Sequence, residues 1–367
     1  MSATQEIWCG GDFMPSHSFA AQSREVWDAF RRPDYVFVNL ETPLTTSSAK
    51  TEKTVWLSAP PRLASELAVA NIHGVTIANN HVMDFGSIGL NDTCMALDGS
   101  GIDRVGAGTD LTDALGPIIF KKERISVAFL GLSASMGIGA AATDSGPGVA
   151  PIHISTQYVV DRLVLPEEPG MALFVQTSVS DSDLARACKA VFSAKSEAEF
   201  VIVGLHWGVC HGFLPPVQGW MATYQQPLAH ALIDAGADAI VGHGPHILHG
   251  IEIYNGKPIF YSLGHVLSHA LSGAGVTMSS QEGPRYDTSC MEDAETKYGG
   301  MAMLTFTEER LATARMRFIS LDEMGEPHWA QGATARAEFE VIEKRSRRFG
   351  TKLVRNGRGD IISIPLT

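Results

Sequence analysis

The stretch Asp238-Ala-Ile-Val-Gly-His-Gly-Pro-His246 places two histidines directly after a short apolar run. The run predicts a buried strand and the Gly-Pro pair predicts a turn, so both imidazoles are expected at the end of one strand. Imidazole is a common ligand for transition metals and a proton carrier near neutral pH. A metal site is therefore one interpretation of this stretch. The other is that one histidine caps the turn and the second packs in the core.

The 367-residue chain has the composition of a globular enzyme, with 45% hydrophobic and 19% charged residues. We expect one elaborated α/β domain over residues 1–330, with a C-terminal helix and tail, residues 331–367, packed on it. No apolar run approaches the roughly 18 residues that a membrane span needs. The N-terminus shows no basic and apolar leader, and five cysteines form no Cys-x-x-Cys pair, so a cytoplasmic location is expected.

The net charge of −12 argues against a nucleic-acid partner, because nucleic-acid binding depends on clustered lysine and arginine. An anionic substrate would need a local cation to overcome this background. We therefore expect a small-molecule substrate and no nucleic-acid partner.

Polar residues follow several apolar runs in the same way as in the opening stretch. The predicted strands include Ile7–Cys9, Tyr35–Leu40, Gly74–Ala78 and Phe200–Leu205. The polar residues at strand ends are Asp12, Glu41, Asn80, His206, His243 and His246. Because helices alternate with these strands, largely parallel sheets are predicted, and the carboxyl ends of parallel strands open onto one crevice. Two carboxylates, one amide and three imidazoles at one rim match the ligands of two adjacent divalent ions.

The chain also resembles a known family, the poly-γ-glutamate capsule biosynthesis protein CapA family, within the calcineurin-like metallophosphoesterase superfamily. The matching segments, in the family's order, are Gly11-Asp12, Asn39-Leu-Glu-Thr-Pro-Leu44, Ala78-Asn-Asn-His-Val-Met-Asp-Phe-Gly86, His206-Trp-Gly208, Gly242-His-Gly-Pro-His246 and Tyr261-Ser-Leu-Gly264. Each segment alone is weakly specific, whereas the ordered set is specific. The resemblance implies a four-layer α/β/β/α sandwich of the calcineurin-like type with a metal centre at one edge.

The resemblance also implies a role for each polar residue. One ion would be held by Asp12 and His246, the bridging carboxylate would be Glu41, and the second ion would be held by Asn80, His206 and His243. His81, paired with Asp84, would stabilise the reacting group or protonate the leaving group. A carboxylate partner can fix the tautomer of a histidine and raise its basicity. The ions would be manganese, zinc or iron.

The chain departs from the family at several positions. Met14 stands where the superfamily usually has a histidine, and His17 is a nearby substitute. Cys210 and His211 follow the His-Trp-Gly segment, where the family often has an acidic residue. His265 follows Tyr-Ser-Leu-Gly, where the family has asparagine. We treat His17, Cys210, His211 and His265 as candidate contacts to substrate or to an additional metal.

These features predict a metal-dependent hydrolase that directs a metal-activated water at a phosphoester, or at an amide or ester of γ-glutamyl type. The loops 131–151 and 268–300 are expected near the site and would select the substrate. The alternative is a non-catalytic accessory protein of poly-γ-glutamate or capsule synthesis with a structural or vestigial metal site. A third hypothesis is a different metal, bound by His17, His211 and His265, for non-hydrolytic chemistry.

Overall fold

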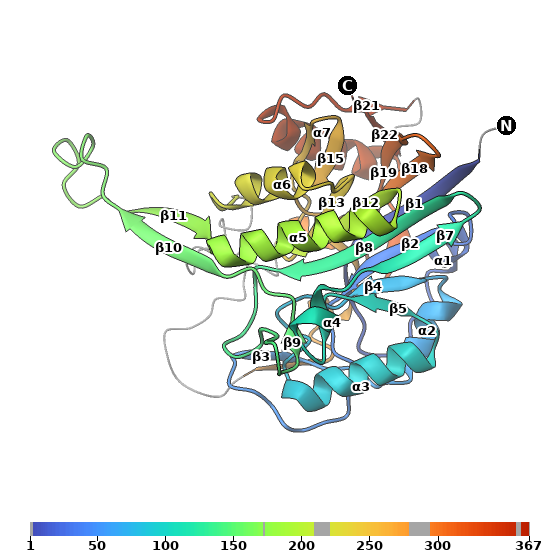
Figure 1. Cartoon of the computed structure of the whole chain (residues 1–367). Helices are drawn as coiled ribbons and strands as arrows, with labels where there is room; N and C mark the ends of the chain where they lie inside the picture. Colours follow the sequence, from blue (N-terminus) through green and yellow to red (C-terminus); the bar gives the residue numbers. More distant parts are fainter. Residues whose placement is uncertain (1–2, 172, 209–220, 279–293, 357–360, 367) are drawn as a thin grey trace.

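Two large β-sheets form the centre of the molecule, and helices lie on their outer faces (Figure 1). The structure is a computed structural model that describes residues 3–171, 173–208, 221–278, 294–356 and 361–366. The α/β class predicted from the sequence is confirmed. None of the helices in these ranges is long and apolar enough to cross a lipid bilayer.

The first sheet has ten strands and contains both the first and the last strand of the described chain. In pairing order its strands are β21 (Val354–Arg355), β22 (Ile361–Ile364), β19 (Leu311–Leu321), β18 (Tyr298–Thr307), β1 (Thr4–Met14), β2 (Tyr35–Leu40), β4 (Gly74–Thr76) and β5 (Asp103–Val105), while β16 (His265–Ser268) pairs with β1 and β20 (Pro327–Trp329) with β19. The pairs among β1, β2, β4 and β5 are parallel, and β16 is parallel to β1. Parallel strands end at the same edge, which concentrates their carboxyl ends there.

The second sheet has six strands, four of which run parallel. In pairing order they are β14 (Ile251–Tyr254), β15 (Lys257–Phe260), β13 (Ala239–His243), β12 (Phe200–His206), β8 (Ile125–Ser133) and β7 (Ile118–Lys122). All residues of β8, β12 and β13 are buried, as expected for parallel strands covered on both faces.

Three smaller pairs of strands lie outside these sheets. They are β3 (Val55–Leu57) with β17 (Val276–Met278), β6 (Ala107–Gly108) with β9 (Gly148–Val149), and β10 (Ile154–Val159) with β11 (Phe174–Val179). The β10–β11 hairpin projects from the body of the molecule (Figure 1). Two 3-10 helices, η2 (His269–Ser272) and η4 (Ala294–Lys297), flank residues 279–293, which belong to the predicted loop 268–300 and lie outside the described residues.

Three apolar cores hold these layers together. The core between the sheets contains Phe37 of β2 against Phe129 of β8, with ring centroids 4.8 Å apart. An outer core joins the first sheet to α1 (Arg24–Ala29), α2 (Leu63–Val69) and α3 (Gly86–Gly99). The other outer core joins the second sheet to α4 (Leu111–Leu115), α5 (Asp181–Glu197) and α6 (Gln225–Asp234). Each sheet thus packs against the other sheet and against helices, because it is apolar on both faces.

The C-terminal segment joins both the core and the first sheet. Helix α7 (Gly332–Arg347) contributes Ala335 and Ile342 to the core between the sheets. Strand β22 pairs with β19 in an antiparallel register.

Strand β1 differs from its predicted extent. The sequence predicts a strand that ends at Cys9, with Asp12 beyond its end, whereas β1 continues to Met14 and Asp12 lies within it. The reason is an irregularity: the register with β2 shifts between Cys9 and Asp12, and pairing with β16 begins at Asp12. Similarly, β13 extends two residues beyond the predicted apolar run, so that His243 is its last residue.

Gly11 permits the close approach of β1 to the segment before β16. A Cβ atom at Gly11 would lie 1.9 Å from the carbonyl oxygen of Gly264, and the next amide, that of Asp12, donates a hydrogen bond of 2.8 Å to the same oxygen. Any side chain at position 11 would therefore push apart the two segments that carry Asp12 and His265.

We predict that Gly11→Ala lowers the free energy of unfolding by about 1–3 kcal/mol, because the methyl group overpacks a backbone contact. Urea denaturation measures the change. Gly99→Ala is the matched control, since a Cβ at Gly99 meets nothing within 4 Å and should leave stability within about 0.5 kcal/mol. Equal stability of both variants would contradict the role assigned to Gly11.

Candidate metal centre

Asp12 lies at the middle of the candidate site and is fully buried. Its position in β1 sets it beside Asn39 of β2 and His265 of β16. The Asn39 amide nitrogen lies 2.8 Å from Asp12 Oδ1 and 3.3 Å from His206 Nδ1, so it holds side chains from both sheets. The other Asp12 oxygen accepts bonds from the Gly244 amide at 3.3 Å and His246 Nδ1 at 3.0 Å. The segment Gly242–His246, which begins within β13 of the second sheet, therefore contacts Asp12 of the first sheet.

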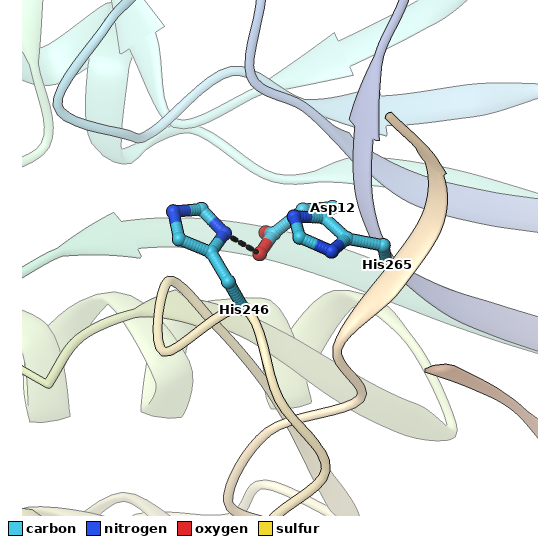
Figure 2. A group of neighbouring side chains, drawn as sticks. All are labelled: Asp12, His246 and His265. Carbon is cyan, nitrogen blue, oxygen red and sulfur yellow. Dashed lines mark hydrogen bonds and ion pairs between the residues drawn. The ribbon is translucent and has the colours of Figure 1, made fainter. Parts of the chain in front are cut away.

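His246 and His265 flank Asp12 with parallel rings (Figure 2), whose centroids are 4.8 Å apart. Ligand atoms of these three residues all lie within 4.8 Å of one another. His265 Nδ1 donates a hydrogen bond of 2.8 Å to the carbonyl oxygen of Thr296, so the lone pair of the neutral ring is on Nε2. That Nε2 atom is buried and meets no hydrogen-bond partner in the described part of the chain. This is the state of an imidazole prepared to bind a metal ion.

Glu41 belongs to a second group, together with Asp12 and His206. The ligand atoms of these three residues again lie within 4.8 Å of one another. Glu41 follows β2 and is fully buried. The Nε2 atoms of both His206 and His246 lie 3.9 Å from Glu41 Oε1. Neither carboxylate oxygen of Glu41 has a hydrogen-bond partner among the described residues. A buried carboxylate in this state is costly unless a cation or a proton neutralises it.

His243 and Asn80 complete the set of unpartnered ligand atoms. His243 Nε2 donates to the carbonyl oxygen of Gly10 at 3.3 Å, which leaves the lone pair on the buried Nδ1. The Oδ1 atom of Asn80 is likewise buried, and the described residues offer it no donor. The unpartnered atoms of Glu41, Asn80, His243 and His265 are all lone-pair donors. Divalent cations bind such atoms, so the residues present fit a metal centre.

Burial keeps most of these imidazoles neutral. It lowers the pKa of His206 to about 3 and the pKa values of His243 and His265 to about 4. Metal ions bind the neutral form of imidazole, so these three rings are available as ligands at neutral pH.

The two carboxylates and His246 shift one another's pKa values. Burial raises the pKa of Glu41, and the neighbouring charge of Asp12 raises it further. Burial alone would lower the pKa of His246, but the charges of Glu41 and Asp12 and the bond to Asp12 raise it to about 9. Burial would raise the pKa of Asp12, yet its bond to His246 and the neighbouring histidine charges lower it overall. A proton on His246 thus compensates the carboxylates without metal, and metal binding would release it.

His81 lies beside the centre, in the turn after β4. Its Nδ1 donates to Asp84 Oδ2 at 2.8 Å, and burial lowers its pKa. Asp84 is fully buried and also accepts a bond of 2.8 Å from the Leu57 amide. The pair predicted from the sequence is therefore formed in the structure.

Two polar residues that the sequence analysis did not single out hold this turn. Lys53 donates to the Asn80 carbonyl oxygen at 2.7 Å and to Asp84 Oδ1. Asn79 Oδ1 accepts the His81 amide at 3.0 Å, and its Nδ2 donates to the Leu40 carbonyl oxygen at 2.9 Å. Asn79 belongs to the Asn-Asn-His segment and could have been found there, whereas no motif marks Lys53.

His17 is not brought to the centre, which corrects its suggested role as a substitute for the histidine missing at Met14. It lies in a separate group with His269 and Glu326, stacked on His269 at 3.7 Å between centroids. His269 accepts the Ser16 amide at Nδ1 and donates to Glu326 at Nε2, each at 3.0 Å, so both nitrogens are occupied. The second histidine beside Asp12, in addition to His246, is His265. Cys210 and His211 lie outside the described residues.

The chain belongs to the bacterial capsule synthesis protein PGA_cap family, whose sequence model matches residues 6–270. The assignment to the CapA family is thereby confirmed. Its curated relatives include the PGA biosynthesis protein CapA of Bacillus subtilis (strain 168), 35% identical over 239 residues, which are 64% of this chain and 53% of that protein. The capsule biosynthesis protein CapA of Bacillus anthracis is 30% identical over 246 residues, 66% of this chain and 52% of that protein. The chain thus spans about half the length of these two relatives.

Two further comparisons extend over more of the chain. A probable polyglutamine synthesis accessory protein of Mycobacterium tuberculosis (strain ATCC 25618 / H37Rv) is 30% identical over 325 residues, 88% of this chain and 74% of that protein. The solved structure of a hypothetical protein from Thermus thermophilus has a TM-score of 0.44 and 14% identity, covering 85% of this chain and 98% of that chain.

The ligand sets implied by the family resemblance, with His265 added on the Asp12 side, predict that single substitutions remove different ions. We expect His265→Ala or His246→Ala to lose the ion beside Asp12, and His243→Ala to lose the other, so each variant falls from about two bound equivalents to about one. Elemental analysis after growth with manganese or zinc measures the content. His328→Ala, at an exposed histidine outside the centre, should retain both ions. Full metal content in all three site variants would contradict the assignment.

Proposed function

We propose that this chain is a metal-dependent hydrolase. The proposal rests chiefly on one observation: buried lone pairs of Glu41, Asn80, His243 and His265 meet no hydrogen-bond donor in the described structure. Around Asp12, these groups offer ligands for two divalent ions, of manganese, zinc or iron. When bound, two such ions polarise a substrate oxygen and lower the pKa of a water molecule towards neutrality.

The chain's own residues would position the substrate and manage the proton. His81, Asn80 and His246 all line a cavity of about 520 Å³, so the His81 ring borders the space in which a substrate would sit. Its Nδ1 is bonded to Asp84, which leaves Nε2 for the reacting groups. Because the ring is neutral, Nε2 would accept a proton as water attacks and return it to the leaving group. Asp84 would keep the tautomer fixed, and Lys53 would hold Asp84 in place.

Both phosphoesters and amides fit this chemistry. The names of the Bacillus and Mycobacterium relatives refer to PGA, capsule or polyglutamine synthesis, and they motivate a γ-glutamyl amide as one substrate class. The metallophosphoesterase resemblance motivates a phosphoester as the other.

The second candidate function is an accessory role in polymer synthesis without catalysis. It is supported by Met14, which replaces the usual ligand of the superfamily's first motif, and by the accessory name of the Mycobacterium relative. Under this alternative the metal centre would stabilise the fold and bind no substrate.

We predict that the metal-loaded chain hydrolyses at least one member of a panel of phosphoesters and γ-glutamyl amides. His81→Ala should lower kcat by about 10²–10⁴-fold, the usual contribution of general acid–base catalysis, while metal content stays unchanged. Turnover assays with parallel elemental analysis measure both quantities, with His328→Ala as the control. Equal rates for His81→Ala and the wild type would refute the role of His81, and no turnover by the wild type would favour the accessory function.

A further inference from the structure

The cavity beside the metal centre has a polar end and an apolar wall. Asn80, His81 and His246 form the polar end, where the chemistry would take place. The side chains that give the rest its apolar character are Met14, Val55, Leu57, Leu271, Val276 and Met278. A substrate bound at the polar end would therefore extend along hydrocarbon.

The same elements that position the catalytic groups also build this wall. Strands β3 and β17 pair antiparallel, with Leu57 opposite Val276 and Val55 opposite Met278. The Leu57 amide donates to Asp84, the partner of His81. Met14 is two residues beyond Asp12, at the end of β1. The wall is thus fixed relative to the reacting groups.

Charge in the cavity is also unsuited to an extended anion. Lys53 is the one lysine or arginine among the described residues that line it. Its ammonium group already donates to Asp84 and to the Asn80 carbonyl oxygen. Met278 lines the cavity and leaves 47% of its surface exposed, so its side chain is accessible to a ligand there. The wall therefore favours an uncharged, apolar group.

A second cavity, of about 330 Å³, gives room for the rest of such a substrate. Lys53 and Asn80 line both cavities, so the second cavity lies next to the first on the Asn80 side. Gly137, Gly139 and Pro147 line the second cavity and belong to the predicted loop 131–151. A scissile bond at Asn80 would have one part of the substrate on each side.

We propose that the substrate carries an apolar group of several carbon atoms next to the bond that is hydrolysed, and that the β3–β17 wall binds this group. This inference rests on the proposed hydrolytic function. Water would add its oxygen to the phosphorus or carbonyl carbon, the bond to the leaving heteroatom would break, and that heteroatom would take the proton. The substrate class is an amphipathic phosphoester, ester or amide.

Binding of n-alkylphosphonates, from methyl to hexyl, tests the proposal independently of turnover. The manganese-loaded full chain is titrated with each compound by calorimetry. Each added methylene should lower Kd by about fourfold until the cavity is filled, as expected for burial of hydrocarbon. A Kd that does not change with chain length, or no detectable binding by any member, overturns the proposal.

A matched pair of methionine variants locates the effect. Met278→Gln should weaken hexylphosphonate binding at least threefold and leave methylphosphonate binding unchanged. Met324→Gln is the control, because Met324 is similarly exposed, at 54%, and does not line the cavity. Equal behaviour of the two variants would overturn the assignment to the β3–β17 wall.

Turnover assays separate this proposal from the hydrolase proposal. A clear dependence of Kd on chain length without hydrolysis of any substrate refutes the hydrolase and leaves the apolar binding site supported. Hydrolysis with no such dependence refutes the apolar site alone.

Discussion

The centre of this molecule depends on one constraint: buried lone pairs that meet no hydrogen-bond donor among the described residues. Each such group costs free energy, and in this site the groups are gathered around the fully buried Asp12. Backbone carbonyls fix the rings of His243 and His265 so that their free nitrogens face inward. Bound cations would offset this cost, and neutral imidazoles bind cations. The fold therefore maintains a site that is unfavourable until it is filled.

The two sheets make this site jointly. Asp12 and Glu41 come from the first sheet, and His206 and His243 come from parallel strands of the second. Because the sheets pack face to face, carboxylates from one meet imidazoles from the other at a shared edge. The cavity beside the centre depends on a small separate sheet, β3 with β17, which is joined to the centre through the bond between Leu57 and Asp84. In the function that we propose, the two large sheets would carry the chemistry and the β3–β17 pair would bind the apolar part of the substrate.

Continuous apolar runs were the most informative part of the sequence. The strand Tyr35–Leu40 was predicted to the residue, because a strand buried on both faces needs an unbroken apolar run. The predicted end of β1 was wrong because pairing with β16 depends on residues about 250 positions away. For the same reason the sequence pointed to His17, which is close to Asp12 along the chain, as the additional histidine of the site. The folded chain instead places His265 beside Asp12. The β10–β11 hairpin and Lys53 carried no pattern that distinguishes them from ordinary loop residues.

The central claim is that the gathered lone pairs bind two metal ions. A crystal structure of protein grown with manganese, with anomalous scattering measured at the manganese edge, tests it most directly. The account predicts two peaks separated by about 3.5–4 Å. One should contact Asp12, His246 and His265, the other Asn80, His206 and His243, with Glu41 between them. A crystal with no peak at this edge of the sheets, or with its only peak beside His17 and His269, would contradict the account.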